Sequence, residues 1–252
     1  MQDIKGLLFD IGGVLYISNT PIAGAVHTIA TLQASFPIRF LTNTTRRTPA
    51  RIRHKLTQMG FSLKEEELFT ALDATKAYIA SQKGSVYTLM TDEATGFFAR
   101  FESDKPDFVV IGDAYTNFEY HRLNTAFRHL LNGATLIAAA KNKYFKDEDN
   151  LLSLDAGGFI EALEFAAQTQ AKCIGKPSKD FFHLAVDSMH LEPNEVLMIG
   201  DDILSDIKGA QDAGLKTALV KTGKFQNTDL HKGIQPDLIL DDVTALSGYL
   251  IH

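Results

Sequence analysis

Short apolar runs alternate with segments of helical periodicity along almost the whole chain. Short apolar runs are typical of buried strands, and longer segments with apolar residues three and four positions apart are typical of helices. The predicted strands span residues 4–9, 37–41, 85–90, 107–111, 134–139, 171–174, 195–199, 216–220 and 237–240. The predicted helices lie near residues 22–34, 48–59, 72–82, 117–131, 158–169, 179–190, 203–213 and 242–250. The alternation predicts an α/β fold whose core is a doubly wound, Rossmann-like parallel sheet.

Polar residues follow several of these strands at the point where each strand ends. In open α/β sheets, ligands bind beyond the carboxyl ends of the strands, so these side chains are expected to converge on one edge. They are Asp10 after the first run, Thr42 and Asn43 after the second, Lys176 after the run 171–174, and Asp201 and Asp202 after the run 195–199, with Asp206 one turn into the next helix.

The interval between Thr42 and Lys176 is much longer than the roughly 30 residues that a βα unit needs, and it contains predicted strands of its own. The simplest explanation is an inserted α/β domain, residues 71–171, seated over the edge where the polar residues gather. The core domain would then be discontinuous and consist of residues 1–70 and 172–252.

Composition narrows the range of partners. The chain has 252 residues, a formal net charge of −6 and a single cysteine, Cys173. A mildly negative protein has no overall attraction for nucleic acid or an anionic membrane, and an anionic substrate would need a local positive site or a metal ion. One cysteine cannot form an intrachain disulfide, and the chain shows neither a signal-peptide pattern nor a membrane-spanning run. We therefore expect a cytoplasmic protein that binds neither nucleic acid nor membrane.

The strand-end residues suit phosphoryl transfer. Asp10 can act as a nucleophile that forms an aspartyl-phosphate, as a metal ligand, or as both. Because a carboxylate repels a phosphate dianion, a divalent cation is needed between them, and Mg²⁺ prefers one or two carboxylates such as those of Asp10 and Asp201. Thr42 can donate a hydrogen bond to a phosphoryl oxygen, and Lys176 can neutralise its charge. The predicted substrate is therefore a small phosphorylated molecule.

Each of these residues also has a structural explanation. Asp10 alone could cap a turn, and Asp201 with Asp202 could cap the next helix. Lys176 alone could be a solvated residue before a helix. Their joint occurrence at successive strand ends favours a shared site.

Four segments in order, "LLFDIGGVLY", "FLTNTTR", "IGKPS" and "MIGDDILSDIKGAQDAGL", resemble the four motifs of the haloacid dehalogenase-like hydrolases. The long insert between the second and third resembles the C2 cap of subfamily IIA. The resemblance implies an Mg²⁺-dependent hydrolase, and subfamily members often form homodimers through the cap. It assigns roles by position: Asp10 as nucleophile and metal ligand, Gly12 as a metal ligand through its backbone carbonyl, Thr42 and Asn43 as phosphoryl contacts, Lys176 as the neutralising charge, Asp201 as a metal ligand, Asp202 or Asp206 as support, and Lys141, Lys143 and Tyr144 as the substrate loop.

One position departs from the family pattern. The usual first motif is D-x-D-G-[TV]-L, but Gly12 occupies the place of its second aspartate, the family's general acid and base. General acid–base assistance is worth about 10²–10⁴ in rate, so substrates whose leaving groups need no protein acid should be favoured. Phosphoramidates, pyrophosphate and aryl phosphates have such leaving groups.

Other functions stay open at this point. A weak or inactive relative could bind phosphate or a regulatory partner without turnover, since function can drift on a fixed fold. A sugar-phosphate or nucleotide phosphatase could replace the missing acid by a cap residue or by water. A phosphorylated receiver domain is disfavoured, because its acidic pair precedes the phosphoacceptor and it carries no large insert.

Overall fold

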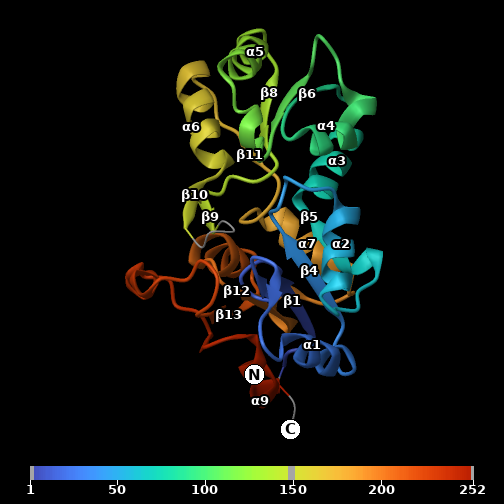
Figure 1. The fold of residues 1–252 in the computed structure, drawn as a ribbon, viewed down its shortest axis with the longest axis vertical. Helices are drawn as coiled ribbons and strands as arrows, with labels where there is room; N and C mark the ends of the chain where they lie inside the picture. Colours follow the sequence, from blue (N-terminus) through green and yellow to red (C-terminus); the bar gives the residue numbers. More distant parts are fainter. Residues whose placement is uncertain (1–2, 147–150, 251–252) are drawn as a thin grey trace.

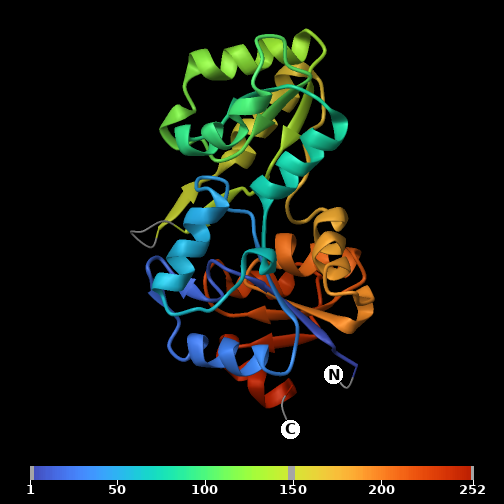
Figure 2. The same ribbon diagram turned by 90° about the vertical axis from the view of Figure 1, so that its right-hand side faces the viewer.

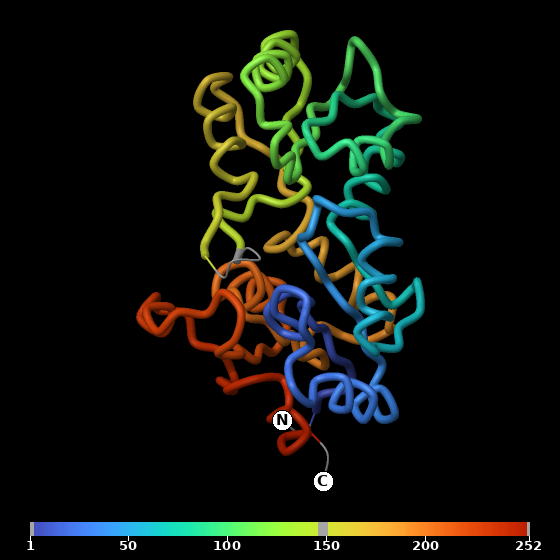
Figure 3. The backbone as a smooth tube through the Cα atoms, in the orientation of Figure 1, coloured from blue at the N-terminus to red at the C-terminus, as the bar shows by residue number. Residues whose placement is uncertain are grey.

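The computed structural model describes residues 3–146 and 151–250. Two sheets with their helices form a lower and an upper body along the longest axis of the molecule (Figure 1). Both ends of the described chain belong to the lower body (Figure 1). The chain passes to the upper body after β5 and returns after β11 (Figure 3).

The lower body is built on a six-stranded sheet in which every neighbouring pair is parallel. In spatial order, its strands are β14 (Leu238–Leu240), β13 (Lys216–Val220), β12 (Val196–Gly200), β1 (Gly6–Asp10), β4 (Ile38–Thr42) and β5 (Leu68–Thr70). All five residues of β1 are buried, as its apolar run predicts for a central strand.

Helices cover both faces of this sheet, because alternate residues of each strand point to opposite sides. Leu7 and Phe9 pack in one apolar cluster with α1 (Ala25–Gln33) and α2 (Pro49–Gln58), whereas Leu8 packs in another with α7 (Lys179–Asp187). The expected doubly wound α/β core is therefore confirmed.

The upper body repeats the same layering on a smaller scale (Figure 2). Its parallel sheet has the order β11 (Lys172–Cys173), β8 (Thr135–Ala138), β7 (Phe108–Ile111) and β6 (Val86–Leu89). One face packs against α5 (Tyr120–Leu131) and α6 (Ala156–Ala167), and the other against α3 (Ala71–Gln82) and α4 (Asp92–Phe98).

All the predicted strands are present, with ends within two residues of the prediction. The short elements were not predicted: β5, α4, the hairpin of β2 (Tyr16–Ile17) and β3 (Thr20–Pro21), and the hairpin of β9 (Tyr144–Lys146) and β10 (Leu152–Leu154). Such strands are defined by their pairing partners, which the local pattern does not reveal.

Two predicted helices differ from expectation. The segment 203–213 begins with a π-helical turn over Ile203–Lys208, in which the Ile207 amide donates to the Asp202 carbonyl, and α8 covers only Gly209–Asp212. The segment 242–250 begins as a 3₁₀ turn, Val243–Leu246, before α9 (Ser247–Leu250).

The expected division into a core and an inserted cap stays a prediction. Lys172 and Cys173, which the sequence placed in the core, pair with β8 of the upper sheet. Within the part of the chain that the structure describes, no helix has the length and apolar character needed to cross a membrane.

Candidate active site

The carboxyl ends of three neighbouring strands bring the strand-end residues together. β12, β1 and β4 lie side by side and parallel, so Asp201, Asp10 and Thr42 emerge at the same edge of the sheet. This edge faces the upper body (Figure 2). Lys176 reaches it from the segment between β11 and α7.

A cluster of carboxylates surrounds one buried lysine at this edge. Asp10, Asp201 and Asp206 each place an oxygen within 4.8 Å of the others. Lys176 Nζ contacts Asp10 Oδ1 and lies 2.7 Å from Asp206 Oδ1. The lysine is only 2% exposed, so these ion pairs form away from bulk water, where a charge is tolerated only when it is paired.

The carboxylates of the cluster carry more negative charge than Lys176 alone can offset. Burial, together with the charges of Asp10 and Asp206, raises the pKa of Asp201 well above its usual range. Burial also raises the pKa of Asp206 to about 6, although Lys176 counteracts the effect. Burial alone would lower the pKa of Lys176, but Asp10 and Asp206 outweigh it and raise that pKa above its usual value. The lysine is therefore charged, and the carboxylates still favour a further cation.

Close backbone packing positions Asp201. A Cβ on Gly13 would lie 2.1 Å from Asp201 Oδ2, and one on Gly223 would lie 1.9 Å from it. Both residues also have positive φ, which suits glycine. The Lys224 amide donates to Asp201 Oδ2 over 2.6 Å. The Asp201 carboxylate therefore occupies space that is available only because both neighbouring positions are glycine.

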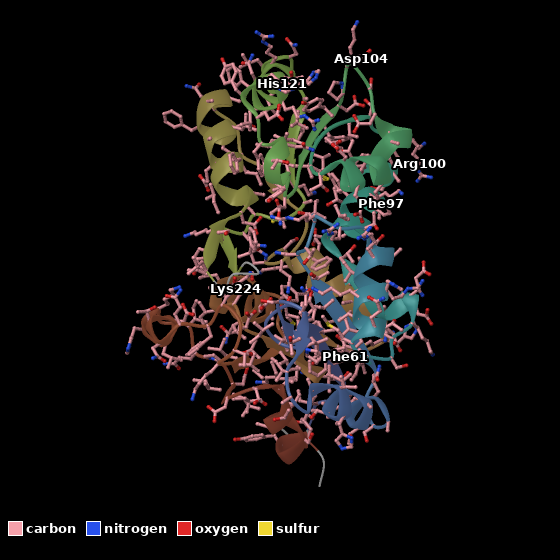
Figure 4. The ribbon with its side chains drawn as sticks, in the orientation of Figure 1. Phe61, Phe97, Arg100, Asp104, His121 and Lys224 are labelled. Atoms are coloured by element: carbon pink, nitrogen blue, oxygen red, sulfur yellow. The ribbon has the colours of Figure 1, made fainter. Side chains whose placement is uncertain are left out.

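Lys224 is a site residue that was not predicted from the sequence. It follows β13, the next strand along the sheet, and Figure 4 shows it where the two bodies meet. Its Nζ lies 3.5 Å from Asp202 Oδ2, and Asp202 and Asp201 raise its pKa against the opposing effect of burial. Its position after another parallel strand was the signal available in the sequence.

The two candidate supporting carboxylates have different positions. Asp202 Oδ1 accepts hydrogen bonds from the amides of Leu204 and Ser205, at 2.9 and 3.0 Å, and therefore caps the following turn. Asp206 lies in the carboxylate cluster, and its second oxygen accepts the Asp202 amide over 3.1 Å. Of the two, Asp206 is the one that contacts Lys176.

The predicted phosphoryl contacts also differ from each other. At the end of β4, the Thr42 hydroxyl oxygen accepts the Thr44 amide over 3.0 Å, and the hydroxyl donates to Thr44 Oγ1 over 3.0 Å. The Asn43 side chain instead brackets the backbone of Lys176: its Oδ1 accepts the Lys176 amide over 2.8 Å, and its Nδ2 donates to the Lys176 carbonyl over 2.7 Å. The Asn43 side chain is therefore engaged in holding the lysine segment.

Gly12 is exposed beside this cluster. A Cβ at this position would have no atom within 4 Å, so the space that a larger side chain would use is open.

A cleft of about 150 Å³ is lined by Asp201 and Lys176 of the cluster and by residues of the upper body, whereas Asp10 and Asp206 are not among its lining residues. The structure brings Lys143 and Tyr144, the predicted substrate-loop residues, to the same cleft as Lys176 and Asp201. The remaining lining residues come from the loop between β8 and β9, from the segment between β11 and α7, from the turn after β12 and from the segment after β13: Lys141, Asn142, Pro177, Asp202, Ile203, Leu204, Ser205, Lys224, Asp229 and Lys232.

Comparison with known proteins agrees with this arrangement. A family model described as haloacid dehalogenase-like hydrolase matches residues 7–102, and one described as HAD-hydrolase-like matches residues 173–246. Haloacid dehalogenase-like hydrolase domain-containing protein 2 of Bos taurus is 40% identical over 230 residues, which cover 91% of this chain and 88% of the relative. Phospholysine phosphohistidine inorganic pyrophosphate phosphatase of Homo sapiens is 37% identical, with 100% and 96% covered.

Among solved structures, a p-nitrophenyl phosphatase from Archaeoglobus fulgidus superposes with a TM-score of 0.89 at 26% identity, covering 98% of this chain and 100% of that one. The fold and the strand-end site define a hydrolase with a doubly wound, Rossmann-like α/β core. The chain belongs to the haloacid dehalogenase-like hydrolases. Within that family, relatives named as phosphatases are similar to this chain over nearly its whole length.

Proposed function

We propose that this protein is an Mg²⁺-dependent phosphohydrolase in which Asp10 is the nucleophile. Its preferred substrates would have leaving groups that need no protein acid, namely phosphoramidates, pyrophosphate and aryl phosphates. The observation that carries the proposal is the buried cluster of Asp10, Asp201 and Asp206 around Lys176.

The donor set fits a hard divalent cation. Carboxylate and carbonyl oxygens are the ligands that Mg²⁺ prefers, and burial with mutual repulsion raises the pKa of Asp201. Asp10, Asp201 and the backbone carbonyl of Gly12 would hold the ion. When bound, it would offset the repulsion between the Asp10 carboxylate and a phosphate dianion.

The protein side chains supply orientation and charge. Lys176 holds the Asp10 carboxylate and offsets the charge of the phosphoryl group, and the Thr42 hydroxyl can donate to a phosphoryl oxygen. An Asp10 oxygen forms a bond to phosphorus while the bond to the leaving atom breaks, and the electron pair departs with the leaving group. Water then attacks the phosphorus of the aspartyl-phosphate, which releases phosphate and restores the carboxylate.

Gly12 determines the leaving-group preference. A side chain at this position could protonate a departing alkoxide, but glycine cannot, and the loss is worth about 10²–10⁴ in rate for leaving groups that require a proton. The nitrogen of a phosphoramidate can carry a proton before the bond breaks, and pyrophosphate and aryl phosphates have less basic leaving groups. The relatives are named as phosphatases of phospholysine, phosphohistidine, inorganic pyrophosphate and p-nitrophenyl phosphate. These names support the same range of substrates for this protein.

A screen of phosphorylated compounds tests the proposal. Purified protein should release phosphate from aryl phosphates and pyrophosphate only with Mg²⁺, and Asp10→Asn should lower the rate by roughly 10³-fold or more. Asp104→Asn, an exposed position on the upper body (Figure 4), is the matched control and should keep the wild-type rate. Turnover that survives in Asp10→Asn, or equal turnover of simple alkyl phosphates, would contradict the proposal.

A further inference from the structure

A side chain from the upper body reaches the segment that carries Lys176. Asn142 follows β8 and lies on the cleft wall. Its Oδ1 accepts a hydrogen bond from Asn43 Nδ2 over 3.1 Å, and the same Asn43 amide brackets the Lys176 backbone. Hydrogen bonds therefore link the upper body to the lysine through a single intermediate residue.

Asn142 is itself held in place by the start of α6. Its backbone carbonyl accepts the Gly157 amide over 2.9 Å, and a Cβ on Gly157 would lie only 2.4 Å from that carbonyl oxygen. Its side chain lies close enough to Asp155, the buried residue that caps α6, to lower the pKa of that carboxyl against the effect of burial. The orientation of Asn142 is thus fixed by the upper body before it meets Asn43.

The direction of each bond in this relay follows from chemistry. Asn43 uses its Oδ1 for the Lys176 amide, so both hydrogens of its Nδ2 face acceptors, the Lys176 carbonyl and Asn142 Oδ1. Since Asn142 accepts there, its Nδ2 is the group that can donate toward the nearby Asp155 carboxylate. A carboxamide at position 142 satisfies both neighbours at once, whereas an apolar residue satisfies neither.

We propose that Asn142 is a positioning residue that makes the alignment of Lys176, and through it of Asp10, depend on the upper body being seated on the cleft. The proposal rests on the proposed function, because alignment matters only if Asp10 and Lys176 act on a phosphoryl group. The relay passes from Asn142, beside Asp155, through Asn43 to the lysine, whose Nζ bridges Asp10 and Asp206. A small displacement of reacting groups lowers turnover steeply even where substrate binding changes little.

The first test separates kcat from KM. With p-nitrophenyl phosphate and Mg²⁺, Asn142→Ala should lower kcat by about tenfold or more while KM changes by less than about threefold. In an Asn43→Ala background the same substitution should have no further effect, because the relay is already broken. Asn132→Ala, an exposed position at the end of α5, is the matched control and should match the wild type.

The second test exchanges the partners in the relay. Asn142→Asp alone places two carboxylates side by side and should impair kcat as Asn142→Ala does. The double variant Asn142→Asp/Asp155→Asn restores a donor at 155 and an acceptor at 142 for both neighbours, and it should recover most of the wild-type kcat. Thermal melting of each variant verifies that it is folded.

Each failure has a distinct meaning. A wild-type kcat in folded Asn142→Ala, an equal loss in the Asn43→Ala background, or a folded exchange variant with no recovery would overturn the role of Asn142 while the phosphatase activity stands. A wild-type protein without phosphate release would overturn the proposed function, and this inference with it.

Discussion

At position 12 the backbone runs past the carboxylate cluster without a side chain, although the space beside it is open. Neighbouring Gly13 differs sharply, because its positive φ and its contact with Asp201 leave no room for a Cβ. Gly13 is therefore required by the packing around it, whereas Gly12 is not required by packing and matters for the chemistry of the site. The missing aspartate is evident from the sequence, and the structure adds that a Cβ at this position has open space.

Restoring the side chain should restore acid catalysis. Gly12→Asp is expected to raise kcat/KM for alkyl phosphates by at least about tenfold, within the range of general acid–base effects, and to change p-nitrophenyl phosphate hydrolysis far less. Steady-state kinetics with both substrate types measures the ratio. A folded variant with no gain on alkyl phosphates would refute the leaving-group argument.

The carboxylates should bind a cation more strongly as pH rises. Burial and the charges of Asp10 and Asp206 raise the pKa of Asp201, a proposed metal ligand, well above its usual range, so a bound cation must displace a proton from it at acidic pH. The rise in Tm caused by Mg²⁺ should therefore be larger near pH 7.5 than near pH 5. Differential scanning fluorimetry with and without Mg²⁺ measures it, and an equal or larger rise at the lower pH would count against a metal at this cluster.

At the scale of elements, the loop after β4 joins the two bodies. Thr45 Oγ1 accepts the Asp113 amide over 2.7 Å, and Arg46 Nε lies 2.8 Å from Asp113 Oδ2. The Arg46 guanidinium also lies 4.5 Å from the Tyr115 ring centroid and 4.9 Å from that of Phe145. The loop that begins next to Thr42 thus provides many of the contacts between the lower and the upper body.

Removing the Arg46 side chain should weaken these contacts between the two bodies. Arg46→Ala loses a partly buried ion pair and two aromatic contacts, so amide hydrogen exchange in residues 112–118 should accelerate several-fold, an effect of about 1 kcal/mol in local opening. Arg46→Lys keeps the charge but not the planar stack, and it should give an intermediate rate. Unchanged exchange in Arg46→Ala would show that other contacts hold the upper body.

The elements that were predicted from the sequence are those that their own local pattern of apolar and polar residues is enough to identify. Buried strands such as β1 and β12 are apolar up to their carboxyl ends, where Asp10 is the last residue of β1 and Asp201 directly follows β12. Lys224 and Asn142 were not found as site residues, because their roles depend on loops brought together by the tertiary fold. The same limit explains why β5 was missed, a short strand that is recognisable only by its pairing with β4.

At the scale of the whole molecule, two layered α/β bodies enclose a cleft that neither forms alone. The lower body supplies the carboxylates and the lysine, and the upper body supplies Lys143, Tyr144 and the Asn142 contact. A net charge of −6 gives the protein no general attraction for phosphate, so recognition depends on this local arrangement. The two bodies therefore have to be seated together for the proposed chemistry.

The central claim is that Asp10 itself takes the phosphoryl group, and trapping the intermediate tests it most directly. The protein is mixed with p-nitrophenyl phosphate and Mg²⁺, quenched in acid during turnover, reduced with borohydride and mapped by peptide mass spectrometry. Reduction of an acyl phosphate at Asp10 to homoserine is the predicted result. Turnover accompanied by modification of a different residue, with Asp10 intact, would contradict the account.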